Sequence, residues 1–260
     1  MCSTCGCGES EVRLTTVQKG TSAPRPGHTH DHDHVHAHAH DHPHEHVPRT
    51  HTLDLEVAVL AKNDGLAAEN RAWLAERGIT ALNLMSSPGA GKTTLLEGTI
   101  AASDRPVTVI EGDQETLFDA ERIRKAGARA IQVNTGAGCH LDAAMVGQAL
   151  QSLQPETDSI LFIENVGNLV CPALFDLGEK RKVVVISVTE GDDKPLKYPH
   201  MFAAADLVVV NKTDLLPYVD FDVDRLVRDA RKLNPGLEIL ALSARTGEGV
   251  DDWRDWLHAL

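Results

Sequence analysis

The sequence predicts an α/β fold, with a mainly parallel seven-stranded sheet between layers of helices. From Leu53 onward, short apolar runs of strand length alternate with longer segments of helical length and pattern. Strands of a parallel sheet are covered by helices on both faces, so they are apolar almost throughout rather than at every second position. The 42% of hydrophobic residues in a chain of 260 residues supports one medium-sized domain with an appended segment.

The expected elements follow in chain order from these apolar runs. The seven strands are 79–85, 107–111, 130–133, 160–164, 183–188, 207–210 and 238–242. Helical segments between them include 92–102, 117–126, 142–153 and 223–233. A further helix, at about 55–77, precedes the first strand. Asp54 is its expected N-cap, because a carboxylate there accepts hydrogen bonds from the free N–H groups of the first turn.

The appended N-terminal segment has two parts. Residues 1–8 hold Cys2, Cys5 and Cys7, and the glycines beside them let the backbone wrap around an ion. Residues 9–52 contain a histidine-rich tract with almost nothing to bury in a core, so we expect it to be disordered without metal. Neutral imidazoles favour nickel, copper and zinc, which indicates metal storage. The expected ligands of the tract are His28, His30, His32, His34, His36, His38, His40, His42, His44 and His46.

The net charge excludes some classes of partner, and the cysteine spacing indicates what the thiols do. A formal charge of −13 argues against nucleic acid or an anionic membrane as the main partner, because phosphate contacts need clustered Lys and Arg. No apolar run approaches the roughly 20 residues of a membrane span, and the first residues lack the basic and then apolar layout of a signal peptide. We therefore expect a cytoplasmic protein with reduced thiols. There, Cys-x-x-Cys-x-Cys spacing indicates metal ligation rather than disulfides.

The loop after the first expected strand has the residues of a phosphate-binding loop. Residues 86–93 read Ser-Ser-Pro-Gly-Ala-Gly-Lys-Thr, and a helical segment follows. The glycines let the backbone close around an anion, the lysine reaches the β- and γ-phosphates, and the threonine ligates Mg²⁺. Ser86 stands where the usual pattern has its first glycine, and an ordinary strand–helix turn is the alternative. The expected nucleotide ligands are Gly89, Ala90, Gly91, Lys92, Thr93 and Thr94.

Two later strand ends predict that the nucleotide is GTP. The sixth expected strand ends in Asn211, Lys212 and, two residues on, Asp214. A carboxylate at Asp214 accepts from both the N1 hydrogen and the 2-amino group of guanine, and adenine presents neither donor there. Ser243 and Ala244, after the last strand, are expected to back the base. Residues 53–260 are therefore the expected GTPase domain.

Acidic residues at other strand ends are candidates for the catalytic side of the site. Lys92, which reaches the phosphates, is one expected catalytic residue. Asp113 is the first choice for the magnesium shell or for orienting water, Glu164 is the second, and Asp119 is a third. A turn acid or a helix N-cap is the alternative for each. Asn168 stands where many small GTPases place a water-orienting glutamine, and this predicts slow intrinsic hydrolysis.

A second metal site is expected at the same edge of the sheet. Cys139 and His140 follow the third strand, and Cys171 lies shortly after the fourth. A small buried thiol and a structural histidine are the alternative. Three ligands leave a tetrahedral or square-planar ion short of donors, so water or a second subunit must complete the shell. We therefore predict a homodimer whose formation depends on nucleotide or metal.

Four motifs resemble the HypB family, the hydrogenase nickel-incorporation GTPases of the SIMIBI type. They are residues 2–7, 86–93, 138–142 and 164–172. The resemblance implies a GTPase that delivers nickel to the NiFe-hydrogenase large subunit together with a zinc-containing, HypA-type nickel chaperone. It also implies a tight nickel site at the N-terminal cysteines and a weaker nickel or zinc site at Cys139, His140 and Cys171.

Two other functions remain open at this point. One is a nickel or zinc storage protein whose GTPase core is secondary, which the histidine tract favours. The other is the related urease accessory GTPase, although that family has a Cys-Pro-His metal motif, whereas here Cys139 and His140 are adjacent. Lys194 and Lys197, after the fifth strand, are candidates for a phosphate contact across a dimer, with a solvated loop as the alternative.

Overall fold

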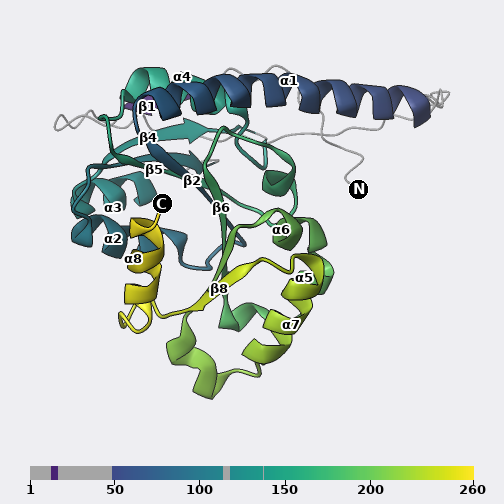
Figure 1. Cartoon of the computed structure of the whole chain (residues 1–260), viewed down its shortest axis with the longest axis vertical. Coiled ribbons are helices and arrows are strands. Elements are labelled where there is room, and N and C mark those ends of the chain that lie inside the picture. Colours follow the sequence, from purple (N-terminus) through teal and green to yellow (C-terminus); the bar gives the residue numbers. More distant parts are fainter. Residues whose placement is uncertain (1–12, 17–48, 114–117, 137) are drawn as a thin grey trace, which may run out of the picture.

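The computed structural model describes residues 13–16, 49–113, 118–136 and 138–260. One eight-stranded sheet crosses the molecule, and helices lie on both of its faces (Figure 1). The strands are β1 (Arg13–Thr16), β2 (Thr80–Ser86), β3 (Val107–Asp113), β4 (Arg129–Asn134), β5 (Ile160–Gly167), β6 (Arg181–Ser187), β7 (Leu207–Asn211) and β8 (Glu238–Ala241). The α-helices are α1 (Arg49–Glu76), α2 (Lys92–Ala102), α3 (Phe118–Ala126), α4 (Ala143–Leu153), α5 (Lys194–Lys197), α6 (Pro199–Ala204), α7 (Val223–Leu233) and α8 (Val250–His258).

The strand order confirms the predicted parallel sheet. It runs β1-β4-β3-β5-β2-β6-β7-β8, and all strands from β2 to β8 pair in parallel. All seven correspond to a strand expected from the sequence. The eighth, β1, pairs antiparallel with the edge strand β4 and lies inside the segment that was expected to lack structure. Four residues give too short a pattern for the sequence to reveal an added edge strand.

Alternate residues of the strands face two helical layers, because successive side chains of a strand point to opposite faces. On one face, Leu82 packs in a core with residues of α2, α3 and α8. On the other face, Ala81 packs with α1 and α4. Met85 lies on that second face, farther along the sheet, with α6 and α7. The central strands are thus buried on both sides, which explains their nearly continuous apolar sequence.

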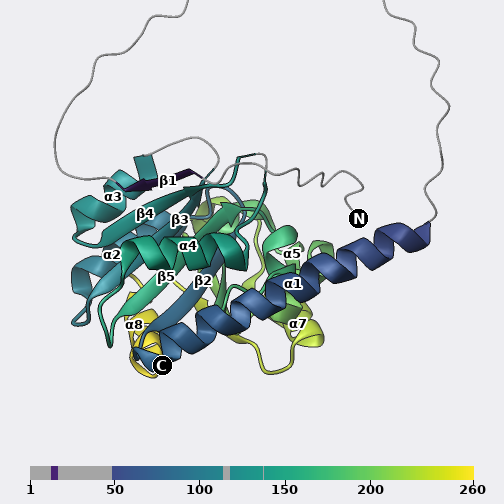
Figure 2. The same ribbon diagram turned by 90° about the horizontal axis from the view of Figure 1, so that it is seen from above.

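Helix α1 corrects one prediction. It begins at Arg49, directly after Pro48, so Asp54 lies inside the helix and is not its N-cap. A proline restricts the residue before it to extended conformations, which makes it a stronger start signal than an acidic residue within a run of helix formers. Figures 1 and 2 show α1 extending past the rest of the fold at its N-terminal end. Among the described residues, no helix is both long and apolar enough to cross a membrane.

Candidate nucleotide and metal site

The expected phosphate-binding loop joins β2 to α2 at the carboxyl edge of the sheet. Gly89 and Gly91 have φ values of 74° and 100°, in the left-handed region that favours glycine. A Cβ on Gly91 would lie 2.4 Å from Nδ2 of Asn211, so this glycine also permits a close approach of residues 211–214, the expected guanine-binding segment, which we call the guanine loop. The loop borders a cavity of about 550 Å³ that is also lined by Lys92 and Thr93. Backbone N–H groups at the start of α2 are therefore available to an anion.

Lys92 is held by the residue that departs from the usual loop pattern. Its Nζ donates a 2.6 Å hydrogen bond to Oγ of Ser86, and its side chain is buried. Burial lowers the pKa of Lys92, although the nearby carboxylate of Glu164 opposes this shift. Ser86 thus supplies an acceptor for the ammonium group within the protein itself.

Carboxylates line the cavity near Thr93. Its Oγ1 donates a 2.9 Å hydrogen bond to Oε1 of Glu164, which is 5% exposed. Burial raises the pKa of Glu164, and it also raises the pKa of the neighbouring Glu111 to about 8, with a further contribution from the Glu164 charge. Within the part of the chain that the structure describes, Oε2 of each of these two glutamates is buried without a hydrogen-bond partner. Two buried acidic groups with free oxygens are chemically suited to a hard divalent cation.

The other two predicted acidic residues also line the cavity. Asp113 lies at the end of β3, and Asp119 in the first turn of α3 forms a 3.1 Å ion pair with Arg122. Arg122 also donates 3.2 Å to Oγ1 of Thr94 and pairs with Glu97. Asp119 is therefore tied to an arginine, whereas Glu164 is tied to the threonine of the phosphate loop.

The guanine-loop residues contact the phosphate loop directly. Asn211 donates 2.9 Å to the carbonyl of Ala90, and Lys212 donates 2.7 Å to the carbonyl of Gly89. The Asn211 side chain also accepts from the backbone N–H of Ala244, 3.0 Å away. The predicted residues are thus joined to the phosphate loop by hydrogen bonds, and Lys212 also lines the cavity.

Asp214 is held in place from the last strand end. Ser243 Oγ donates to the Asp214 carboxylate at 2.7 Å, so one carboxylate oxygen remains available to a ligand. This arrangement brings the segment after β7 and the segment after β8 together, as expected for residues that recognise and back a base.

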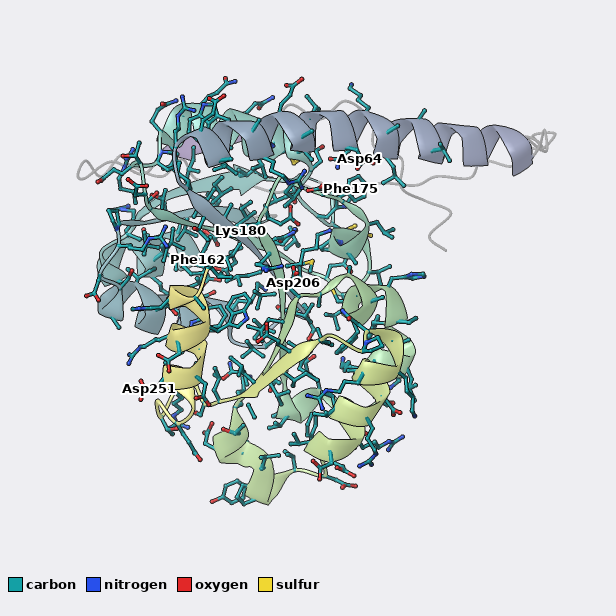
Figure 3. All side chains as sticks on the ribbon, viewed as in Figure 1. Asp64, Phe162, Phe175, Lys180, Asp206 and Asp251 are labelled. Atoms are coloured by element: carbon teal, nitrogen blue, oxygen red, sulfur yellow. The ribbon has the colours of Figure 1, made fainter. Side chains whose placement is uncertain are left out.

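The three predicted core metal ligands come together. The ligand atoms of Cys139, His140 and Cys171 all lie within 4.8 Å of one another, and Sγ of Cys139 is 3.6 Å from Nδ1 of His140. The His140 ring packs against the Phe175 ring with centroids 4.0 Å apart. Figure 3 labels Phe175 just below α1 in that view. Burial lowers the pKa of His140, which favours the neutral imidazole that binds a metal. Two sulfurs and one nitrogen suit a borderline or soft ion.

One continuous segment, residues 164–171, contacts both sites. Glu164 accepts from Thr93 of the phosphate loop, whereas the next side chain, Asn165, accepts 3.1 Å from the N–H of Leu141 in the metal-ligand loop. Asn168 donates 3.2 Å to the carbonyl of Cys139. Gly167 lies so near the phosphate loop that a Cβ there would be 3.1 Å from Cα of Pro88. The segment ends at Cys171, itself a predicted ligand. We call it the connecting segment.

Several residues at the site were given no role in the predictions from the sequence. Glu111 and Arg122 line the cavity, and Glu190 accepts from Ser87 of the phosphate loop. Glu111 and Glu190 lie at or just after the ends of expected strands, and this position could have indicated that they belong to the site. Lys194 pairs with Glu190 at 3.4 Å, and Lys197, whose side chain is 59% exposed, pairs with Asp193 at 2.7 Å; a phosphate contact of either lysine across a dimer stays a prediction. The N-terminal cysteines and the histidine tract lie outside the described residues.

The fold and the site define a nucleotide-binding protein with a phosphate-binding loop, and comparison with known proteins supports this class. The sequence profile of the CobW/HypB/UreG nucleotide-binding domain matches residues 80–241. The hydrogenase maturation factor HypB of Escherichia coli is 60% identical over 207 residues, which cover 79% of this chain and 71% of that protein. The HypB of Azotobacter chroococcum is 49% identical over 279 residues, which cover 99% of this chain and 92% of that protein.

Solved structures agree with these relatives. The crystal structure of HypB from Helicobacter pylori in complex with nickel has a TM-score of 0.73 and 42% identity, covering 76% of this chain and 94% of that one. The crystal structure of HypB from Archaeoglobus fulgidus has a TM-score of 0.72 and 43% identity, covering 77% of this chain and 98% of that one. The chain therefore belongs to the HypB family of hydrogenase maturation factors and is a P-loop GTPase.

Proposed function

We propose that GTP binding and hydrolysis in this chain gate the release of nickel from the core site during hydrogenase maturation. The observation that carries the proposal is the connecting segment, which accepts a hydrogen bond from Thr93, contacts the backbone of the metal-ligand loop twice, and contributes Cys171. A switch that moves with the γ-phosphate therefore shifts one metal ligand relative to the other two.

The chain's residues have distinct roles in this hydrolysis. The N–H groups at the start of α2 bind phosphate oxygens. Lys92 also binds them, and its ammonium group exchanges its hydrogen bond to Ser86 for one to the nucleotide. Asp214 accepts from guanine. Asp113 orients the water that attacks the γ-phosphorus as the bond to the GDP oxygen breaks. Asn168 is held by its bond to Cys139, so intrinsic hydrolysis is slow.

Mg²⁺ fits the acidic side of the cavity, because Glu164 and Glu111 each keep a buried carboxylate oxygen without a partner among the described residues. Thr93 and Glu164 are the residues that would hold it, which leaves Asp113 to orient the water. When bound, the ion neutralises charge on the β- and γ-phosphate oxygens. Removal of Mg²⁺ with a chelator should abolish hydrolysis, and hydrolysis that persists without it contradicts the assignment.

The core ion is cargo, and its three ligands leave the coordination shell incomplete. Val170 and Leu174 flank Cys171 and are 49% and 52% exposed. A second copy of the chain that packs on these side chains would bring further ligands, which favours a homodimer formed with nucleotide or metal. A protein that stays monomeric with GDP and with GTP, in the presence of nickel or zinc, would refute this part of the proposal.

The nickel gate is tested in the full chain with Cys2, Cys5 and Cys7 replaced by Ser. Cys139 and Cys171 are then the remaining cysteines, so thiolate-to-nickel charge-transfer absorption reports the core site even when the histidine tract binds metal. We expect nickel affinity, measured against a chelator that fixes free nickel, to differ between GDP and a non-hydrolysable GTP analogue. Equal affinity in both states would mean that GTP does not gate this site.

A storage protein with a secondary GTPase core is the second candidate, and the histidine tract favours it. The tract would then hold most of the metal, and its capacity would fall between pH 7.5 and 5.5 as imidazoles are protonated. The client is proposed as the NiFe-hydrogenase large subunit, reached with a HypA-type nickel chaperone in the cytoplasm. Loss of urease but not hydrogenase activity on gene deletion would favour the urease accessory role.

A further inference from the structure

Helix α1 places two asparagines where an apolar stripe is expected. The buried positions of its C-terminal half are Asn63, Ala67, Asn70 and Leu74, which follow helical spacing along one face. Asn63 is 5% exposed and Asn70 is 8% exposed. Burying a polar amide costs free energy unless it is hydrogen-bonded, so the partners of these side chains indicate what the positions are for.

Asn63 connects the two chain segments that carry the core metal ligands. Its Oδ1 accepts 2.9 Å from the N–H of Ala143, three residues after His140. Its Nδ2 donates 2.7 Å to the carbonyl of Asp176, five residues after Cys171. One amide thus contacts both segments, and it satisfies a free N–H in the first turn of α4.

Asn70 makes the same connection about two turns further along the helix. Its Nδ2 donates 2.8 Å to the carbonyl of Ala143 and 3.1 Å to the carbonyl of Leu177. Both protons of the amide are used, one on each segment. The two asparagines therefore fix the spacing between the start of α4 and residues 176–177.

Two glycines allow α1 to lie close enough for these contacts. A Cβ on Gly178, which has a φ of +92°, would lie 2.7 Å from the backbone oxygen of Ala67. A Cβ on Gly147 would lie 3.0 Å from Oδ1 of Asn70. Arg71 adds an ion pair to Asp176 at 2.6 Å, on the exposed side of the same contact.

We propose that Asn63 and Asn70 are positioning residues of the core metal site, which hold the Cys139–His140 segment and the Cys171 segment at the separation that an ion requires. This inference rests on the proposed metal function. In a tetrahedral shell with metal–ligand bonds of about 2.0–2.3 Å, ligand atoms lie roughly 3.3–3.8 Å apart. The ligand atoms here are already within 4.8 Å of one another, so binding needs a closure of at most about 1.5 Å, and segments free to separate would bind more weakly.

The test uses the full chain with Cys2, Cys5 and Cys7 replaced by Ser, and the probe is nickel alone at chelator-fixed free concentrations. Asn63→Ala and Asn70→Ala should each raise the free nickel that half-saturates the thiolate-to-nickel band by about tenfold or more, the range known for outer-shell partners of metal ligands. Asn63→Asp keeps the acceptor for Ala143 and loses the donor to Asp176, so it should weaken binding while preserving the shape of the side chain.

Asn234→Ala is the matched control. Asn234 donates 2.9 Å to the carbonyl of Ala205, so its loss removes a similar bond from a distant part of the fold. It should leave nickel half-saturation unchanged, and GTP affinity should be unchanged in all variants. Unchanged nickel binding in folded Asn63 and Asn70 variants overturns the proposal, as does equal weakening in the control. If Cys171→Ala keeps the full band, the metal site itself is wrong.

Discussion

Alanine at Gly91 should destabilise the fold far more than alanine at Gly89, although the two glycines belong to the same loop. Both have positive φ values, 100° and 74°, so each substitution forces a side chain into the left-handed region, at about 1–2 kcal/mol. A Cβ on Gly89 meets no atom within 4 Å. A Cβ on Gly91 would lie 2.4 Å from Nδ2 of Asn211, well inside van der Waals contact.

The difference between the two variants can be worked out from the bonds of Asn211. Its amide has to move by about 1 Å, which breaks the 2.9 Å bond to Ala90 and disturbs the bonds accepted from the backbone of Lys212 and Ala244. A lost hydrogen bond is worth about 1 kcal/mol net, and a buried group left unpaired costs about 1–3 kcal/mol. Gly91→Ala should therefore cost about 2–4 kcal/mol more than Gly89→Ala.

The assay is urea unfolding of the nucleotide-free protein, followed by tryptophan fluorescence, with the two variants compared at equal concentration. Because the strain at positive φ is common to both, Gly89→Ala is the internal control for it. Similar free energies of unfolding for the two variants would refute the close packing of Asn211 against Gly91.

Three further predictions concern the site. Glu111 has a pKa raised to about 8, so the folded state holds a proton that the unfolded state releases above about pH 4.5. Stability should therefore fall as pH rises from 5 to 8, by up to about 1.4 kcal/mol per pH unit, and urea unfolding of Glu111→Gln should show a flatter profile. Asn165→Ala removes the acceptor for Leu141, so nickel affinity should become independent of nucleotide in chelator competition; a retained difference would exclude this route. Intrinsic GTP hydrolysis should stay below about one per second at steady state, and a faster rate without a partner would contradict the expected effect of Asn168.

Several elements were predictable from the sequence because their signals are local. Strand ends followed by Gly-Ala-Gly-Lys-Thr or Asn-Lys-x-Asp identify the nucleotide loops, and helices α2 and α7 were predicted to the residue. The start of α1 was misplaced at Asp54, because local propensity does not show how far upstream a helix continues. The short strand β1 was missed, because its pairing with β4 is a long-range event with little sequence pattern.

At the candidate site, too, some features were predictable from the sequence and others depend on the tertiary structure. The sequence by itself predicted the chemistry: which residues are suited to bind phosphate, guanine and a soft metal, and that the predicted ligands from residue 86 onward lie at or after the ends of parallel strands, at one edge of the sheet. Only the tertiary structure decided which acid is bonded to Thr93, that Glu111 is buried with a raised pKa, and that Asn63 and Asn70 join the two metal-ligand segments. The physical reason is that residue type and spacing fix what a side chain can bind, whereas burial and hydrogen-bond partners depend on segments far apart in the chain. Asn63 and Asp176, for example, are separated by 113 residues.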